Sequence, residues 1–369
     1  MSLIAFARGV PAPEMLPVEQ LQAAAVAAFA ADPIPLLSYG TGAGWGPLRA
    51  RLAARHGVDA ARVVVTAGSL GGFAMLAQTI AARAQREGRR ARVIVECPSY
   101  DRPLLILERF GIEAVPVPLG PDGIDLDEFE AAAARGADFA YLIPTFQNPA
   151  GATLPEAGRI RLLEIARDHG VPVLEDDPYG LLHFDDDHPA PTSIFDFADG
   201  WEGAWWSGSF SKTIAPGLRV GWMVLPTKLA AAVAQLANDT YISASFLGQA
   251  TVDQFLASGD FEPNVVRSRE LLAERCARIT AALDEYLPGA TYTAPGGGYF
   301  IWVRLPDGLD AARVAAIAGE HGVSFIPGAS FGTGLDDCVR LAFSSPPLDE
   351  IAVGIQRLAA ACAAAHTTA

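Results

Sequence analysis

The stretch SGSFSKTIAPGLRVGW, residues 207–222, decides how the rest of the chain is interpreted. It begins where an apolar run ends and leads through Ser209 and Ser211 to Lys212. A lysine among small hydroxyl residues, with Arg219 beyond a Pro-Gly turn, can have its pKa lowered and act as a Schiff-base nucleophile. A nucleotide phosphate loop would need glycine directly before the lysine, where Ser211 stands. ATP binding of that kind is therefore disfavoured.

Lysine is rare in this chain, which draws attention to Lys212. Of 27 lysine and arginine residues, only Lys212 and Lys228 are lysines. An amine can lose its proton, whereas a guanidinium group stays charged in proteins. The composition therefore indicates a chemical need for an amine at position 212. Lys228 begins an alanine-rich helical stretch without such surroundings and is interpreted as a surface residue.

The composition describes a folded chain and disfavours several function classes. The chain is 51% hydrophobic and 19% charged, with a mean hydropathy of +0.24, which suffices for a large core. A net charge of -15 repels nucleic acid, so no such partner is expected. The cysteines and histidines form no metal or redox motif, and no metal is expected. Without a signal peptide or an apolar run of about 18 residues, we expect a cytoplasmic protein away from membranes.

Short apolar runs alternate with amphipathic stretches along most of the chain. This alternation is typical of an α/β fold with a mostly parallel sheet and helices on both faces. The predicted strands are 63–65, 92–95, 139–143, 171–174, 204–206 and 220–225. The predicted helices include 70–86, 102–110, 126–134 and 156–168. From about Pro288 the pattern changes to that of a smaller α+β unit.

Polar and aromatic residues follow the predicted strands, at the ends where ligands of open α/β sheets bind. A buried carboxylate at Asp176 could hold a heteroaromatic ring nitrogen protonated while Tyr179 hydrogen-bonds a ring oxygen. The TAGS turn, residues 66–69, either suits a phosphate or is an ordinary helix cap. Asn148, by turn statistics alone, is a turn residue. Arg340 lies inside an apolar strand and needs an anionic partner, for which a substrate carboxylate is a candidate.

Five motifs, in their order and separations, resemble those of the fold-type I pyridoxal-phosphate aminotransferases. They are PTFQNPAG (144–151), EDDPY (175–179), SGSFSKTIAPGLRVGW (207–222), PGGGYFIWV (295–303) and VRLAF (339–343). The chain is most similar to the 2-aminoadipate and kynurenine aminotransferase branch, whose catalytic-type domain is shared with MocR regulators. The resemblance implies a seven-stranded type of sheet in a large cofactor-binding domain at 41–250. It also implies an N-terminal arm at 1–40 and a small C-terminal domain at 251–369.

The resemblance implies how individual residues would bind pyridoxal 5'-phosphate. Lys212 would form the Schiff base and shuttle the proton, Asp176 would pair with the ring nitrogen, and Tyr100 would stack on the ring. Asn148 and Tyr179 would hydrogen-bond the ring oxygen. The phosphate would be bound by Ser69, the backbone at Leu70, Ser209, Ser211 and Arg219. Related sequences usually carry two glutamines where this chain has Leu70 and Gly71, so one polar contact differs.

The resemblance extends to the substrate and the second subunit. Arg340, assisted by Asn148, would hold the substrate α-carboxylate. Tyr39 matches a tyrosine that reaches into the neighbouring subunit's site, which implies a homodimer with shared active sites. Arg8 replaces a residue that is commonly small in this motif, and we consider either a contact with a substrate side-chain carboxylate or a plain surface role.

The sequence therefore predicts an aminotransferase that moves the amino group of an L-amino acid to a 2-oxo acid by a ping-pong mechanism. One alternative is a pyridoxal-phosphate enzyme of the same fold that catalyses decarboxylation, elimination or oxidation. A second alternative is the non-catalytic, cofactor-binding sensory domain of a transcriptional regulator. The acidic composition and the lack of an N-terminal winged-helix segment argue against the second.

Overall fold

The central element of the fold is an eight-stranded sheet. The computed structural model describes residues 2–185, 187 and 189–367. The strands follow the order β2 (Val63–Thr66), β9 (Gly221–Val224), β8 (Ala204–Ser209), β7 (Val173–Asp176), β6 (Phe139–Leu142), β3 (Arg92–Cys97), β4 (Glu113–Gly120) and β5 (Gly123–Ile124). From β8 to β4 the strands are parallel, while β9 and β5 run antiparallel to their neighbours. The mostly parallel sheet of seven-stranded type is confirmed, with the two-residue β5 added at its edge.

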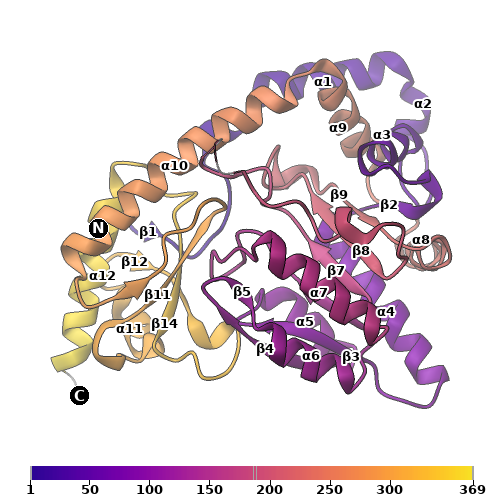
Figure 1. Ribbon diagram of the computed structural model, residues 1–369. Helices are drawn as coiled ribbons and strands as arrows, with labels where there is room; N and C mark the ends of the chain where they lie inside the picture. The colour runs from indigo at the N-terminus through magenta and orange to yellow at the C-terminus, as the bar shows by residue number, and fades with distance from the viewer. Residues whose placement is uncertain (1, 186, 188, 368–369) are drawn as a thin grey trace.

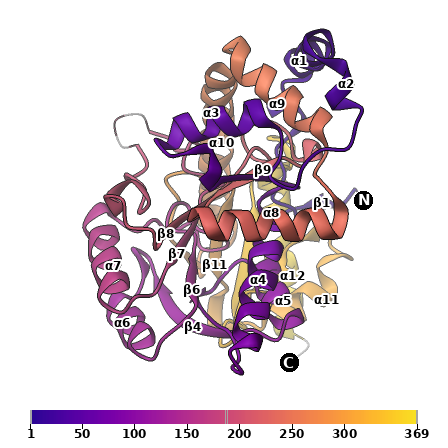
Figure 2. The ribbon, with the colours of Figure 1, turned by 90° about the vertical axis from the view of Figure 1, so that its right-hand side faces the viewer.

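Alternating side chains of the central strands build a core on each face of the sheet. Val93 and Val95 of β3 belong to the core beneath α4 (Ser69–Arg86), α5 (Asp101–Arg109) and α8 (Thr227–Tyr241). Ile94, between them, belongs to the core beneath α6 (Leu126–Ala134) and α7 (Glu156–Asp168). This period of two is that of a strand buried on both faces. Figure 2 shows the layers, with α6 and α7 on one side of the strands and α4 and α8 on the other.

The C-terminal part builds a second, smaller sheet. Its strands follow the antiparallel order β10 (Thr291–Tyr292), β11 (Phe300–Arg304), β14 (Cys338–Ala342) and β13 (Ile326–Pro327). The helices beside it are α10 (Phe261–Tyr286), α11 (Ala311–Ala318) and α12 (Glu350–Thr367) (Figure 1). Strand β1 (Ile4–Ala5) pairs in parallel with β12 (Val323–Ser324), so both ends of the chain contribute to this part of the molecule.

The N-terminal segment returns from β1 to the edge of the large sheet. It forms α1 (Val18–Ala31), α2 (Pro33–Leu36) and α3 (Gly46–His56), and α1 packs along α9 (Phe246–Ser258). The division into 1–40, 41–250 and 251–369 stays a prediction. Among the residues that the structure describes, no helix has the length and apolar character needed to cross a membrane.

Most predicted elements are present, and the differences have physical causes. Helices α6 and α7 have the predicted bounds because their apolar residues recur with a clear helical period. Strand β7 lies two residues later than predicted and β8 extends three residues further, so that Asp176 and Ser209 are the last residues of strands. Strand β4 was not predicted because Pro116 and Pro118 argue against a strand, and here both prolines are exposed near the sheet edge.

Candidate active site

A cavity of about 500 Å³ opens at the carboxyl ends of the central strands, where they face the smaller sheet. All of the predicted cofactor and substrate residues except Tyr39 line it: Arg8, Ser69, Leu70, Tyr100, Asn148, Asp176, Tyr179, Ser209, Ser211, Lys212, Arg219 and Arg340. Parallel strands end at one edge of a sheet, so residues far apart in sequence meet there. The expected common crevice is therefore present.

Lys212 follows β8 and is partly exposed to the cavity. Its amine donates a hydrogen bond to the carbonyl oxygen of Gly9 and lies 5.2 Å from the ring centre of Tyr299. The Tyr299 hydroxyl donates to the carbonyl oxygen of Lys212 at 2.9 Å. Burial, together with the positive charges of Arg340 and Arg219, lowers the pKa of Lys212 to about 8. About a tenth of this amine is therefore neutral at pH 7, a much larger share than at the ordinary lysine pKa.

Asp176 ends β7 with its side chain buried beneath the cavity. The Tyr141 hydroxyl donates to Oδ2 at 2.8 Å, whereas Oδ1 is buried without a hydrogen-bond partner among the described residues. Burial raises the pKa of Asp176 to about 6, although the hydroxyls of Tyr141 and Ser207 oppose this rise. An unpartnered buried acceptor is costly, so Oδ1 is suited to a donor that arrives with a ligand.

Arg340 lies on β14 between two aromatic rings, those of Phe300 at 4.4 Å and Phe331 at 4.9 Å. Its Nη1 donates to Oδ1 of Asn148 at 3.0 Å and its Nη2 donates to the Ala7 carbonyl at 2.8 Å. Its Nε is buried without a partner in the described part of the chain. The guanidinium group is therefore held in one orientation with donor capacity to spare.

A cradle for an anion forms where α4 begins. Gly68 has a φ of +78°, and a Cβ there would lie 2.5 Å from Nη2 of Arg219. Arg219 Nη2 also donates to the Ala67 carbonyl at 3.3 Å. After β8, the Ser209 hydroxyl donates to Oγ of Ser211 at 3.0 Å. Hydroxyl groups, a guanidinium and a helix start together suit a phosphate.

Two tyrosines complete the walls of the cavity. Tyr100 precedes α5, and burial raises its pKa to about 12. Tyr179 is buried against Tyr299 and Phe300, with ring centres 5.7 and 6.0 Å away. Both phenols therefore stay protonated at neutral pH and can donate hydrogen bonds.

The family model for aminotransferases of class I and II matches residues 6–358. The chain belongs to the class I and II aminotransferases. This aminotransferase is 34% identical to the 2-aminoadipate transaminase of Thermus thermophilus, over 96% of this chain and 89% of that protein. It matches the crystal structure of LysN, an α-aminoadipate aminotransferase from the same species complexed with N-(5'-phosphopyridoxyl)-L-leucine, with a TM-score of 0.91. That match has 32% identity and covers 100% of this chain and 94% of the other.

A regulator is also similar to the aminotransferase. The HTH-type transcriptional regulator YdcR of Escherichia coli is 30% identical over 90% of this chain and 71% of that protein. The family and the relatives named as aminotransferases nonetheless make the chain a transaminase that depends on pyridoxal 5'-phosphate.

The cavity of the aminotransferase fits this cofactor. The unpartnered Oδ1 of Asp176 suits a protonated ring nitrogen, and the cradle of Ser69, Ser209, Ser211 and Arg219 suits the phosphate. The amine of Lys212 lies in the same cavity, where it can meet an aldehyde. The residues present therefore match the three parts of the cofactor.

The roles predicted for Tyr39 and Arg8 stay predictions, and two further residues of the site were not predicted. Tyr39 is 88% exposed and does not line the cavity of its own chain. Arg8 is exposed at the cavity wall. Tyr141 and Tyr299, which hold Asp176 and Lys212, were not predicted as site residues. Tyr299 belongs to the motif PGGGYFIWV (295–303), but only the fold shows that its side chain lies beside Lys212.

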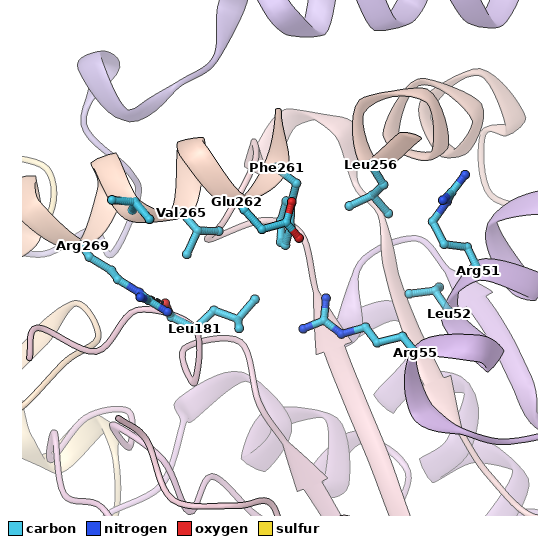
Figure 3. A pocket seen from close by; sticks show the side chains of 10 residues that line it. Arg51, Leu52, Arg55, Leu181, Leu256, Phe261, Glu262, Val265 and Arg269 are labelled. Carbon is cyan, nitrogen blue, oxygen red and sulfur yellow. Dashed lines mark hydrogen bonds between the residues drawn. The ribbon is translucent and has the colours of Figure 1, made fainter. Parts of the chain in front are cut away.

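A second cavity, of about 490 Å³, lies between α3, α10 and the segment at Leu181 (Figure 3). Its walls are largely apolar, and Figure 3 shows Arg55 reaching in from α3 opposite Glu262 of α10. None of the residues that line it also lines the cavity around Lys212. It is therefore separate from the active site of the aminotransferase.

Proposed function

We propose that this aminotransferase transfers the amino group of an L-amino acid to a 2-oxo acid through Lys212, Asp176 and Arg340. The observation that carries the proposal is that Lys212, Asp176 and Arg340 line one cavity, and that two of their polar atoms are buried without a hydrogen-bond partner among the described residues. These atoms are Oδ1 of Asp176 and Nε of Arg340. The first suits a ring nitrogen and the second a substrate carboxylate.

Each residue has a distinct part in the proposed reaction. Bound pyridoxal phosphate supplies an aldehyde for the amine and a ring that withdraws electrons from the bond that breaks. Lys212, once its amine is free, accepts the proton from the substrate α-carbon and passes it to the cofactor. Asp176 holds the proton on the ring nitrogen. Arg340 orients the substrate by its carboxylate, while Asn148 and Tyr179 bind the ring oxygen and Tyr100 packs on the ring face.

We also propose a homodimer in which Tyr39 completes the partner's site. Tyr39 is 88% exposed, and Ile34 and Leu37 beside it are 70% and 71% exposed, so this segment presents an apolar surface. Mixing a Lys212→Ala chain with a Tyr39→Ala chain tests the idea. A shared site predicts recovered activity in the hybrid, because one of its two sites contains both native residues. Mixed chains that stay inactive while light scattering shows a dimer would contradict it.

We further propose that the enzyme is cytoplasmic and has no nucleic-acid partner. Four free cysteines and a net charge of -15 support these two points. The likeness to YdcR keeps a sensory function as the second candidate. Conversion of an amino acid to its 2-oxo acid separates the two functions.

The decisive experiment follows the cofactor absorbance of the purified protein. We expect an absorbance band of lysine-bound cofactor that borohydride reduction fixes onto Lys212. Adding L-amino acids one by one should convert the bound cofactor to its amine form. Adding a 2-oxo acid should reverse this conversion. Decarboxylation, elimination or oxidation would release other products from the same complex. Lys228→Ala is the matched control, and a protein whose trapped label maps to Lys228 would overturn the assignment.

A further inference from the structure

A buried polar pair lies behind the active site without lining its cavity. Glu96, on β3, is 2% exposed, and Gln147, in the loop after β6, is 1% exposed. Neither residue lines the cavity around Lys212. The mechanism proposed above uses neither of them.

The pair joins the ends of two neighbouring strands. Oε2 of Glu96 accepts hydrogen bonds from the backbone N–H of Ile143 at 3.1 Å and from Nε2 of Gln147 at 3.0 Å. Nε2 of Gln147 also donates to the carbonyl of Pro98 at 2.9 Å, and Oε1 accepts from the N–H of Ala150 at 2.8 Å. Groups on two separate loops therefore converge on two side chains.

The two loops carry different walls of the cofactor site. Asn148 directly follows Gln147 and accepts the hydrogen bond from Arg340. Tyr100 lies two residues after Pro98, and the N–H of Ser99 between them donates to the carbonyl of Phe331 at 2.9 Å. The ring of Phe331 in turn packs on Arg340. A shift between the loops would therefore move Asn148 and Tyr100 relative to each other and to Arg340.

Glu96 is a buried carboxyl group without a cation beside it among the residues described, and burial raises its pKa to about 7. Glu175, the corresponding buried carboxylate of β7, has Arg159 at 3.4 Å. Glu96 has no ion-pair partner in the ranges that the structure covers. A buried carboxylate without a cation is costly unless N–H donors satisfy it. Its two donors come from the segment that leads to Asn148, so the carboxylate stabilises that segment specifically.

We propose that Glu96 and Gln147 are positioning residues that fix Asn148 against the cofactor ring oxygen and Tyr100 against the ring face. This inference rests on the proposed function of Asn148 and Tyr100. The pair acts through other side chains and touches neither substrate nor cofactor. The pair keeps Asn148 and Tyr100 in place on the two walls of the site while one substrate replaces the other.

The test compares Gln147→Ala and Glu96→Leu, which removes the acceptor of both hydrogen bonds, with Ser99→Ala in the cofactor-loaded enzyme. The Ser99 hydroxyl is buried in the same region without a hydrogen-bond partner among the described residues, so its removal should leave the loops in place. The main readout is the pH titration of the lysine-bound chromophore. Because an N–H donor at the ring oxygen weakens the chromophore's hold on its proton, a displaced Asn148 should raise the titration midpoint.

We expect both positioning variants to raise the midpoint and to lower kcat/KM about tenfold to a hundredfold, while Ser99→Ala matches wild type. Midpoints equal to that of wild type in a folded Gln147→Ala enzyme would overturn the inference and leave the proposed function intact. If Glu96→Leu does not fold, the Gln147→Ala result alone decides. A wild-type protein without the chromophore would instead refute the proposed function.

Discussion

Nη1 of Arg340 donates a 3.0 Å hydrogen bond to Oδ1 of Asn148, a residue 192 positions earlier in the chain. Arg340 belongs to the smaller sheet and Asn148 to the loop after β6 of the large sheet. This part of the cavity is therefore assembled from both sheets. Each side chain orients the other, and Phe300 and Phe331 keep the guanidinium plane in place.

Replacing Arg340 with lysine should reduce kcat/KM by about 100-fold, chiefly by raising KM for both substrates. Lysine keeps the charge but lacks the planar fork that binds a carboxylate through two hydrogen bonds, and such charged bonds contribute about 1.5–3 kcal/mol. Steady-state kinetics measures the change. Arg304→Lys is the control, because Arg304 lies on adjacent β11 and pairs with Asp337 outside the cavity. Unchanged KM values would contradict a carboxylate contact.

The rate at which cofactor-free protein captures pyridoxal phosphate should rise with pH, with a midpoint near 8. In the proposed function the neutral amine of Lys212 is the nucleophile, and burial together with Arg340 and Arg219 lowers its pKa to about 8. Stopped-flow absorbance follows the capture. In Arg340→Gln the amine loses a positive neighbour, so its pKa and the midpoint should both move upward. A midpoint that stays fixed in this variant would show that Arg340 does not tune Lys212.

Tyr141→Phe should weaken cofactor binding more at pH 6 than at pH 8. The Tyr141 hydroxyl stabilises the Asp176 carboxylate, so its removal raises the pKa of Asp176 above its value of about 6. At pH 6 more of Asp176 is then protonated and unable to pair with a charged ring nitrogen, while at pH 8 it remains ionised. Equilibrium dialysis measures the dissociation constants. Tyr292→Phe, which loses a hydroxyl bonded to Asp284, is the control.

Arg8→Ala should lower kcat/KM for amino acids with a side-chain carboxylate about threefold to fivefold, the effect of an exposed ion pair, and leave neutral substrates unchanged. Arg8 is an exposed cation at the cavity wall, and a second carboxylate can approach it through water or directly. A panel of acidic and neutral amino acids measures the preference. A ratio equal to that of wild type would assign Arg8 to the surface.

The sequence allowed prediction of most strands and helices, because these depend on local patterns. It also allowed the prediction that residues following different strands line one cavity. Helices α6 and α7 have a clear apolar period, and residues at strand ends must meet at one edge of a parallel sheet. Tyr141 could not be assigned, since its contact with Asp176 crosses 35 positions and depends on the register between β6 and β7. Glu96 was missed for the same reason, because its partners come from the next loop in space.

Arg159→Met should lower the free energy of unfolding by about 3–5 kcal/mol, because it removes one member of a buried ion pair. Arg159 and Glu175 are each 1% exposed, and Nη2 of Arg159 also donates to Pro144 and Thr145 at the start of the Asn148 loop. Burial already raises the pKa of Glu175 to about 8, and losing Arg159 raises it further. The deficit should therefore grow between pH 6 and 9, since wild-type Glu175 ionises beside Arg159 above its pKa of about 8, whereas the folded variant has to keep Glu175 protonated. Urea unfolding of the cofactor-free protein at pH 6 and 9 measures this trend.

Arg161→Met, which breaks only the exposed pair with Asp127, should change stability by less than about 1 kcal/mol at both pH values. A deficit for Arg159→Met as small as that of Arg161→Met would show that the buried pair does not stabilise the loop.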